Sequence, residues 1–300
     1  MWGQPLVLAF ALLLEVADVP RRWRGHIVSR LVPPQIHPAA LIYRAAARLA
    51  VKGRVLRNVA VVFLLTSLVA LIFWAVQNYL GSGLWQAVLE AYLLKLAFSE
   101  THILYPCLWG YRGDECPREV VQQFVRRDLS STSCPHVASA CLESAAESFV
   151  DSFVSPLFWY ALLGLPGAWI QRTANMLDGL MGFKEWGRSG APAARLDTAL
   201  NWAPARIAAL FILASAYMAG SRPDLTALKD RRFIESINAR WPISAMAAAI
   251  RVKLEKPGSY SVGSGRLPHK DDVGRGLAVL AVAATLYSTA LLLSLYIIYI

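Results

Sequence analysis

The stretch "VAVVFLLTSLVALIFWAVQ" at residues 59–77 determines the fold class, because it contains no charged residue. A helix needs about 20 apolar residues to cross the hydrocarbon core of a bilayer. This stretch therefore predicts a membrane-spanning helix, and residues 277–300, which also lack charge, predict a second. A third candidate covers 84–98, where Glu90 and Lys95 would need partners inside a helical bundle.

The composition of the whole chain is typical of a membrane protein. Hydrophobic residues make up 56% of the 300 residues, charged residues only 17%, and the mean hydropathy is +0.42. Nucleic-acid binding requires a basic face on a soluble module, which this hydropathy disfavours despite a net charge of +10. We expect no nucleic-acid partner. We expect one all-α, polytopic helical domain over 1–300, with about four to six membrane-embedded helices and with the site on cytoplasmic helical loops.

The distribution of charge predicts the orientation. Residues 20–57 hold eight arginines and Lys52, and no acid occurs between 19 and 89. Residues 221–275 carry eleven lysines or arginines, so both segments are expected in the cytoplasm. The acidic segment 99–152 returns to the same side if the two candidate spans before it form a hairpin. The sequence therefore predicts a multi-pass protein of the cell membrane whose site faces the cytoplasm.

A repeat of acidic residues lies in "ESAAESFVDSFVSPLFW" at 143–159. Glu143, Glu147 and Asp151 follow one another at intervals of four, which places them along one face of a helix. A solvated helix face is the plain explanation. Small residues between the acids, the lack of Lys or Arg from 128 to 171, and the adjacent apolar run favour a bound cation instead. Magnesium fits, since it typically binds one or two carboxylates together with substrate phosphates.

The apolar run at 153–170 is interrupted by helix breakers, Pro156 near its start and Gly164, Pro166 and Gly167 near its end. Only about 16 of its residues are apolar, fewer than a span requires. An intact span is one interpretation. We favour a re-entrant or shallow hairpin that keeps both flanks on one side of the membrane.

Two polar motifs follow, "NMLD" at 175–178 and "ARLDTALNWAPAR" at 194–206. Each places a carboxylate and an amide about one helical turn apart, and arginines flank the second pair. Helix caps and intrahelical salt bridges explain this spacing, and spacing alone favours them. A metal-phosphate site is the functional interpretation, because guanidinium groups bind phosphate oxygens while the acids hold the ion. The residues concerned are Asn175 and Asp178 in the first motif and Arg195, Asp197, Asn201 and Arg206 in the second.

Other motifs are less informative. The four cysteines, Cys107, Cys116, Cys134 and Cys141, form no C-x-x-C pair, so we expect free thiols or an incidental disulfide. His37 precedes a proline and is expected at the start of a helix. The chain has no glycine-rich phosphate loop of the common types, so any nucleotide would occupy an unusual site.

Taken in order, the motifs resemble those of the CobD/CbiB family of membrane proteins, the adenosylcobinamide(-phosphate) synthases of cobalamin biosynthesis. The resemblance covers nearly the whole chain, and the block from Glu143 to Arg206 is its most specific part. The segments that carry it are Asp18 and Pro20, "HP" at 37–38, "LLKLAFS" at 93–99, "RRDLS" at 126–130, "ESAAESFVDSFVSPLFWYALLGLPGA" at 143–168, "NMLDGLMGFK" at 175–184, "ARLDTALNWAPAR" at 194–206, "NARWPISAMA" at 238–247, "LEKPGSY" at 254–260 and the last apolar helix.

The resemblance implies an enzyme that joins aminopropanol, or aminopropanol phosphate, to the free propionate carboxylate of adenosylcobyric acid. It implies ATP as co-substrate and Mg²⁺ as cofactor. A cation-coupled transporter and a non-enzymatic membrane sensor of the same family are the alternatives, and a homo-oligomer is compatible with the sequence. The expected site residues are Glu143, Glu147, Asp151 and Asp178 for the metal, Lys184, Arg195 and Arg206 with Asn175, Asp197 and Asn201 for the nucleotide, and Asp128 or His37 as proton acceptor.

Overall fold

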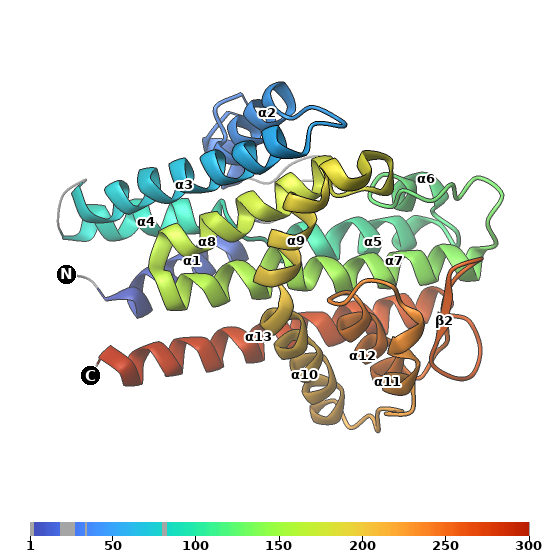
Figure 1. The fold of residues 1–300 in the computed structure, drawn as a ribbon. Coiled ribbons are helices and arrows are strands. Elements are labelled where there is room, and N and C mark those ends of the chain that lie inside the picture. The colour runs from blue at the N-terminus through green and yellow to red at the C-terminus, as the bar shows by residue number, and fades with distance from the viewer. Residues whose placement is uncertain (1–2, 19–27, 34, 80–82, 300) are drawn as a thin grey trace.

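The computed structural model describes residues 3–18, 28–33, 35–79 and 83–299, and these residues are almost entirely helical (Figure 1). Pro20 of the early motif lies outside the described residues, as does the first part of the "GSG" turn at 81–83. The elements in chain order are α1 Gln4–Ala17, η2 Ser29–Leu31, α2 Pro38–Leu49, α3 Val55–Tyr79, α4 Leu84–Lys95, α5 Thr101–Gly113, α6 Arg118–Gln122, α7 Cys134–Phe149, η3 Val150–Val154, α8 Ser155–Met181, η4 Lys184–Ser189, α9 Ala191–Leu200, α10 Trp202–Met218, α11 Ala227–Asp230, η5 Arg231–Phe233, α12 Arg240–Ile250, β1 Leu254–Lys256, β2 Tyr260–Val262 and α13 Lys270–Tyr299.

The described residues contain three helical segments long and apolar enough to cross a membrane: Val55–Tyr79, Cys134–Met181 and Lys270–Ile298. A fourth is possible by length and composition if α9 and α10, which meet at 47°, form one bent span. Both spans expected from uncharged sequence are thus helices of sufficient length. The chain is an all-α polytopic helical membrane protein.

The candidate span at 84–98 is wrong, because α4 ends at Lys95 after only 12 residues. Helix α4 packs against the equally short α1. The expectation that its charges need partners is confirmed: Glu90 accepts a hydrogen bond from Gln86 at 2.9 Å, and Lys95 contacts two buried carboxylates. These two helices pack inside the bundle, and each is too short to cross the membrane by itself.

The chain reverses at Gly164, as the hairpin predicted for 153–170 requires. Gly164 has φ of +68°, a conformation open to glycine, and a Cβ there would lie 2.6 Å from the Gln77 side chain. That amide oxygen of Gln77 accepts the N–H of Leu165 at 2.9 Å and so closes the turn. The prolines cause no further break, because Pro156 occupies the first turn of α8 and the residues after Gly164 are helical.

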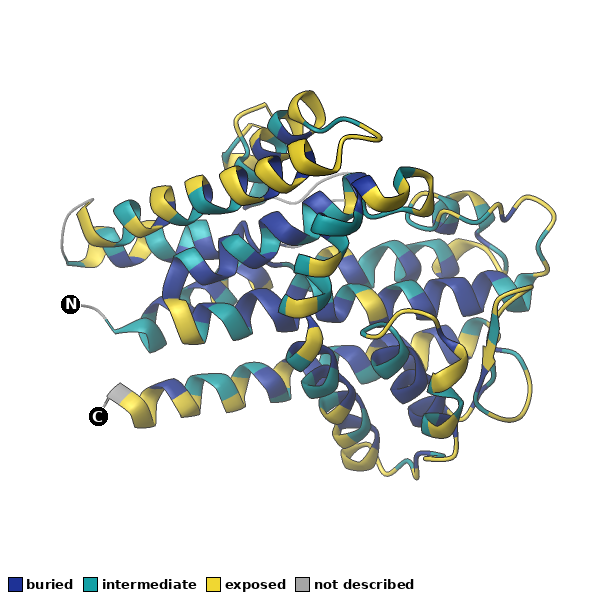
Figure 2. Cartoon of the chain, viewed as in Figure 1, coloured by how far each residue is buried: buried dark blue, intermediate teal, exposed yellow. Residues whose placement is uncertain are grey.

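The bundle has two chemically different ends (Figure 1). The start of α1, the end of α3, the start of α4 and the end of α13 lie at one end, and α5, α6, α11, α12 and the β-hairpin lie at the other. Charged residues are absent from 58–89 and from 152–171, the two segments that contain the turns at the first end. The helices between the ends expose large apolar side chains, including Phe63 at 73% and Ile297 at 73% (Figure 2). Such exposure is expected of surfaces that face lipid.

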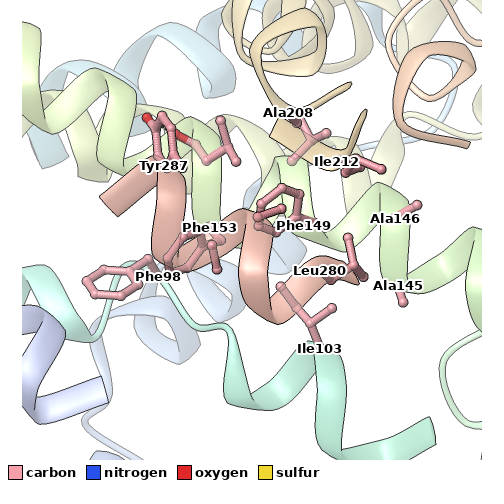
Figure 3. Close-up of a cluster of buried hydrophobic side chains, with 14 of the residues drawn as sticks. Phe98, Ile103, Ala145, Ala146, Phe149, Phe153, Ala208, Ile212, Leu280 and Tyr287 are labelled. Carbon is pink, nitrogen blue, oxygen red and sulfur yellow. Dashed lines mark hydrogen bonds between the residues drawn. The ribbon is translucent and has the colours of Figure 1, made fainter. Parts of the chain in front are cut away.

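A core of aromatic and small residues holds α7, η3, α10 and α13 together (Figure 3). Phe149 and Phe153 stack with centroids 5.8 Å apart, and Phe153 meets Tyr287 of α13 edge to face at 6.3 Å. The Tyr287 hydroxyl donates to the backbone oxygen of Val154 at 3.0 Å, which fixes α13 against the segment that carries the acidic repeat.

The four cysteines form two disulfides, so the expectation of free thiols is wrong. Cys107 of α5 bonds to Cys141 of α7, and Cys116 bonds to Cys134 at the start of α7. The packing of α5 against α7 brings the paired Cα atoms to 6.2 Å and 5.1 Å, distances that a disulfide can bridge. The spacing of the four cysteines along the sequence does not predict this pairing.

Candidate functional site

A cavity of about 460 Å³ opens between the end of α7, the end of α8, α9 and the segment before α12. Five carboxylates face it: Glu147 of α7, Asp151 of η3, Asp178 of α8, Asp197 of α9 and Glu235 in the segment before α12. We call this the acidic cavity. Its other lining residues are Val150, Gly182, Ala194, Thr198, Ser236, Asn238, Ala239 and Pro242.

The reversal at Gly164 explains why these motifs meet. It returns α8 along the bundle to the end from which α7 started, so Asp178 comes close to Asp151 although 27 positions separate them. Packing of α9 against α8 then adds Asp197. The motifs around Glu147, Asp178 and Asp197, together with the "NARWP" segment, therefore form one site.

An amide network connects two of these carboxylates, Asp151 and Asp197. Asn201 Nδ2 donates to Asp151 Oδ1 at 3.1 Å and to Asp197 Oδ1 at 2.9 Å. Asn175 Nδ2 reaches the same Asp197 oxygen at 3.5 Å, and the fully buried Gln171 donates to Asn201 Oδ1 at 3.2 Å. The predicted partners Asn175, Asp197 and Asn201 are thus brought together by the fold rather than by intrahelical caps alone.

The sequence argument missed Arg172. Its Nη1 atom lies 3.3 Å from Ser152 Oγ and 3.4 Å from Asn175 Oδ1, and its charge acts on Asp151. Arg172 is the first cation after Arg127 and follows directly on the 128–171 segment that lacks Lys and Arg. Its position three residues before Asn175, on the same helix face, was the available signal.

Three of the four predicted metal ligands, Glu147, Asp151 and Asp178, line the acidic cavity. Glu143 does not: it accepts hydrogen bonds from Ser139 at 2.6 Å and from Tyr260 at 2.9 Å, and Arg127 lies 3.2 Å away. Within the described ranges, no three Asp, Glu, His or Cys side chains are arranged to hold a metal ion by themselves. The donor set nevertheless suits Mg²⁺, which takes few protein carboxylates and completes its shell with water and phosphate.

None of the predicted phosphate-binding cations lines the cavity. Lys184 forms an exposed ion pair, at 3.1 Å, with the cavity residue Glu235. Arg195 is exposed on α9. The Arg206 guanidinium lies over the rings of Trp202, 4.1 Å from its centroid, and Trp241, 5.1 Å from its centroid.

The two predicted proton acceptors differ in environment. His37 caps α2, and its Nδ1 accepts the N–H of Ala39 at 3.2 Å. Burial, and then the positive charges of Arg172 and Lys95, lower the pKa of His37, so its imidazole is uncharged at neutral pH. Asp128 is exposed, and hydrogen bonds from the backbone and hydroxyl of Ser130 lower its pKa.

The two arginines directly before Asp128 contact the helices of the site. Arg127, next to Asp128, contacts Glu143, and Arg126 lies over the Phe183 ring and donates to the Gly179 backbone oxygen at 3.2 Å. The "RRDLS" motif therefore directs its arginines, rather than its aspartate, toward the helices of the site.

A buried ionic cluster contains Asp18 of the early motif and Lys95 of the "LLKLAFS" motif. Lys95 Nζ lies 2.7 Å from Glu15 and 3.0 Å from Asp18, and the three side chains are 1%, 4% and 0% exposed. The Glu15 carboxylate also accepts the N–H groups of Glu100 and Thr101 at 2.7 and 2.8 Å. This cluster, Glu15, Asp18 and Lys95, joins α1 and α4.

Comparison with known proteins agrees with these motifs. A sequence model of the family described as "CobD/Cbib protein" matches residues 8–292. The "Probable cobalamin biosynthesis protein CobD" of Aeropyrum pernix is 37% identical over 269 residues, which cover 85% of this chain and 84% of that protein. The "Cobalamin biosynthesis protein CobD" of Rhodobacter capsulatus is 33% identical over 292 residues, 90% of this chain and 92% of that protein. No solved structure matches the chain. The chain belongs to the CobD/CbiB family.

Proposed function

We propose that this protein acts in cobalamin biosynthesis as an ATP-dependent carbon–nitrogen ligase, joining aminopropanol or its O-phosphate to the propionate carboxylate of adenosylcobyric acid. The observation that carries the proposal is the acidic cavity. Five carboxylates line one space, and amide side chains join two of them, Asp151 and Asp197, although unpaired charge next to apolar helices is unfavourable. A purely structural bundle has no use for such a cluster.

The reaction needs an activated carboxylate, because a carboxylate and an amine do not condense directly. A propionate oxygen attacks the γ-phosphorus of ATP, ADP leaves, and an acyl phosphate forms. The amine nitrogen then attacks the acyl carbon, inorganic phosphate leaves, and one proton is lost from the nitrogen. Both steps depend mainly on positioning and on neutralising oxygen charge.

Different residues of the chain would bind the metal, bind the phosphates and accept the proton. Glu147, Asp151 and Asp178, with Asp197, would hold Mg²⁺, which supplies neutralisation of phosphate oxygens. Asn175 and Asn201 hold the carboxylates in place, and Lys184, Arg195, Arg206 and Arg172 supply guanidinium and ammonium groups for phosphates. His37, uncharged at neutral pH, is better suited than Asp128 to accept the proton that the amine nitrogen loses when it attacks the acyl carbon.

We test this proposal by reconstitution. Purified protein is incubated with adenosylcobyric acid, Mg-ATP and either aminopropanol or its O-phosphate, and mass spectrometry detects the amide. We expect product with at least one amine, and a loss of about 10²-fold in rate for Glu147→Gln. A chain that binds these substrates without forming product would be a sensor, and the ligase proposal would then be abandoned.

The site must lie on the cytoplasmic side, since ATP is found there. The arrangement of the bundle supports this, because the uncharged turns lie at the end opposite the acidic cavity and positive segments favour the cytoplasm. A cation-coupled transporter is less well supported: the described residues provide three or four apolar spans, few for two inverted halves.

Cysteine labelling measures the orientation. All described cysteines are in disulfides, so a new cysteine is the only free thiol in the described part of the chain. We expect Arg188→Cys, on exposed η4, to resist a membrane-impermeant maleimide in right-side-out vesicles and to react in inverted ones. Asn78→Cys, at the uncharged end, should show the opposite pattern. Labelling of both positions from the same side would contradict the proposed topology.

A further inference from the structure

The "LEKPGSY" motif has no role in the account above, and the structure shows how it is built. Strands β1 and β2 pair antiparallel, with Lys256 opposite Tyr260. Between them, Ser259 N–H donates to Lys256 O at 2.9 Å. Pro257 and Gly258, the latter with φ of +73°, occupy the central positions of a type II turn. The motif therefore specifies a tight hairpin with Lys256 at its tip.

The hairpin is fixed to α7, the helix that carries the acidic repeat. Glu255 N–H donates to Ser139 Oγ at 2.7 Å, and the Tyr260 hydroxyl donates to Glu143 Oε2 at 2.9 Å. The Glu255 carboxylate lies 3.2 Å from His136 Nε2. These contacts hold the backbone on both sides of Lys256, so its position is set by the fold.

The pairing places Lys256 on the face of the hairpin that meets α7. Residues directly opposite each other in an antiparallel pair project from the same face, so Lys256 shares the face from which Tyr260 reaches Glu143. Glu147 lies one helical turn beyond Glu143 and lines the acidic cavity. The charges of Lys256 and Arg127 both act on the Glu147 carboxylate.

Lys256 is also available. Its side chain is exposed, and the described residues include no ion pair that involves it. By contrast, Arg127 is already paired with the buried Glu143, 3.2 Å away. A phosphate entering a cavity walled by carboxylates needs a cation that is not already neutralised.

We propose that Lys256, held at the tip of the β1–β2 hairpin, binds a phosphate group of the substrate in the acidic cavity. The proposal rests on the ligase function above and adds a binding residue to it. The ammonium donates hydrogen bonds to phosphoryl oxygens on the Glu147 side. The phosphate belongs either to ATP or to aminopropanol phosphate, two sources with the same chemistry.

Thermal unfolding of the full chain in detergent tests this inference without relying on turnover. Wild type, Lys256→Gln, Lys256→Arg and the control Lys52→Gln, an exposed lysine in the turn before α3, are titrated with Mg-ATP and, separately, with aminopropanol phosphate. We expect Lys256→Gln to raise the apparent Kd for one compound about 10- to 100-fold, with partial rescue by arginine and no effect of the control. The compound affected identifies the source of the phosphate.

Other outcomes have distinct meanings. If the wild type is stabilised and Lys256→Gln responds equally, the inference about Lys256 is wrong while the ligase proposal is untouched. If Lys256→Gln loses affinity equally for both compounds, the lysine acts through its general charge and not through a contact with one phosphate. That result would also overturn the inference about Lys256. If the wild type responds to neither compound and forms no amide, the ligase proposal itself has failed.

Discussion

We expect the Asp151→Asn variant to form amide product about 10²- to 10³-fold more slowly than wild type. Asp151 occupies the centre of the site: it lines the acidic cavity, accepts a hydrogen bond from Asn201 at 3.1 Å and lies within the field of Arg172. Asparagine keeps its shape but removes the negative charge that would hold the metal and phosphate in place. Product formation in the reconstituted reaction, at saturating ATP, measures the effect.

The control for this variant is Asp271→Asn, which removes an exposed carboxylate from the first turn of α13, away from the acidic cavity. It should retain wild-type turnover. Thermal unfolding must show that Asp151→Asn is folded. Equal turnover of the two variants would mean that the acidic cavity is not the catalytic centre.

Replacing Lys95 by methionine should lower the free energy of unfolding by about 3–5 kcal/mol, because it leaves buried carboxylates without the ammonium they share. The side chains of Lys95, Glu15 and Asp18 are at most 4% exposed, so water cannot replace the lost cation. The melting temperature and the yield of folded protein in detergent measure the loss.

A triple variant separates charge from packing. Lys95→Met combined with Glu15→Gln and Asp18→Asn removes all three charges and leaves groups of similar shape. Most of the lost stability should return, since replacing a whole buried ion cluster is far less harmful than breaking it. A triple variant as unstable as Lys95→Met alone would show that packing, not charge, accounts for the effect.

The sequence predicted the spans and the hairpin because both follow from local features. Uncharged length predicts α3 and α13, and helix breakers predict a reversal inside 153–170. The mistaken span at 84–98 has a physical reason too. Apolar composition alone does not reveal that α4 stops at Lys95, where the side chain turns to Glu15 and Asp18.

The acidic repeat shows that regular spacing along a helix does not by itself place all three acids in one site. Steps of four residues exceed the helical period of about 3.6, so each step rotates the side chain further around the helix. The π-helical turn at Val150–Val154 changes the rotation again just at Asp151. Glu143 therefore faces Tyr260 and Arg127, whereas Asp151 faces α8 and α9.

Some contacts within the site could not be predicted from spacing, because they join distant segments of the chain. Arg172 and Asn201 meet the repeat only after α8 has reversed, and Tyr260 arrives 117 positions after Glu143 on a strand of three residues. Two three-residue strands lie below the length at which alternation is recognisable.

The uncharged turns bear on how the protein enters its membrane. Moving an ionised side chain through hydrocarbon is opposed by several kcal/mol, roughly 2.5–3.5 for each residue during insertion. The loops of both hairpins, within 58–89 and within 152–171, carry no Asp, Glu, Lys or Arg. Each of these loops can thus enter the lipid without carrying an ionised side chain into the hydrocarbon.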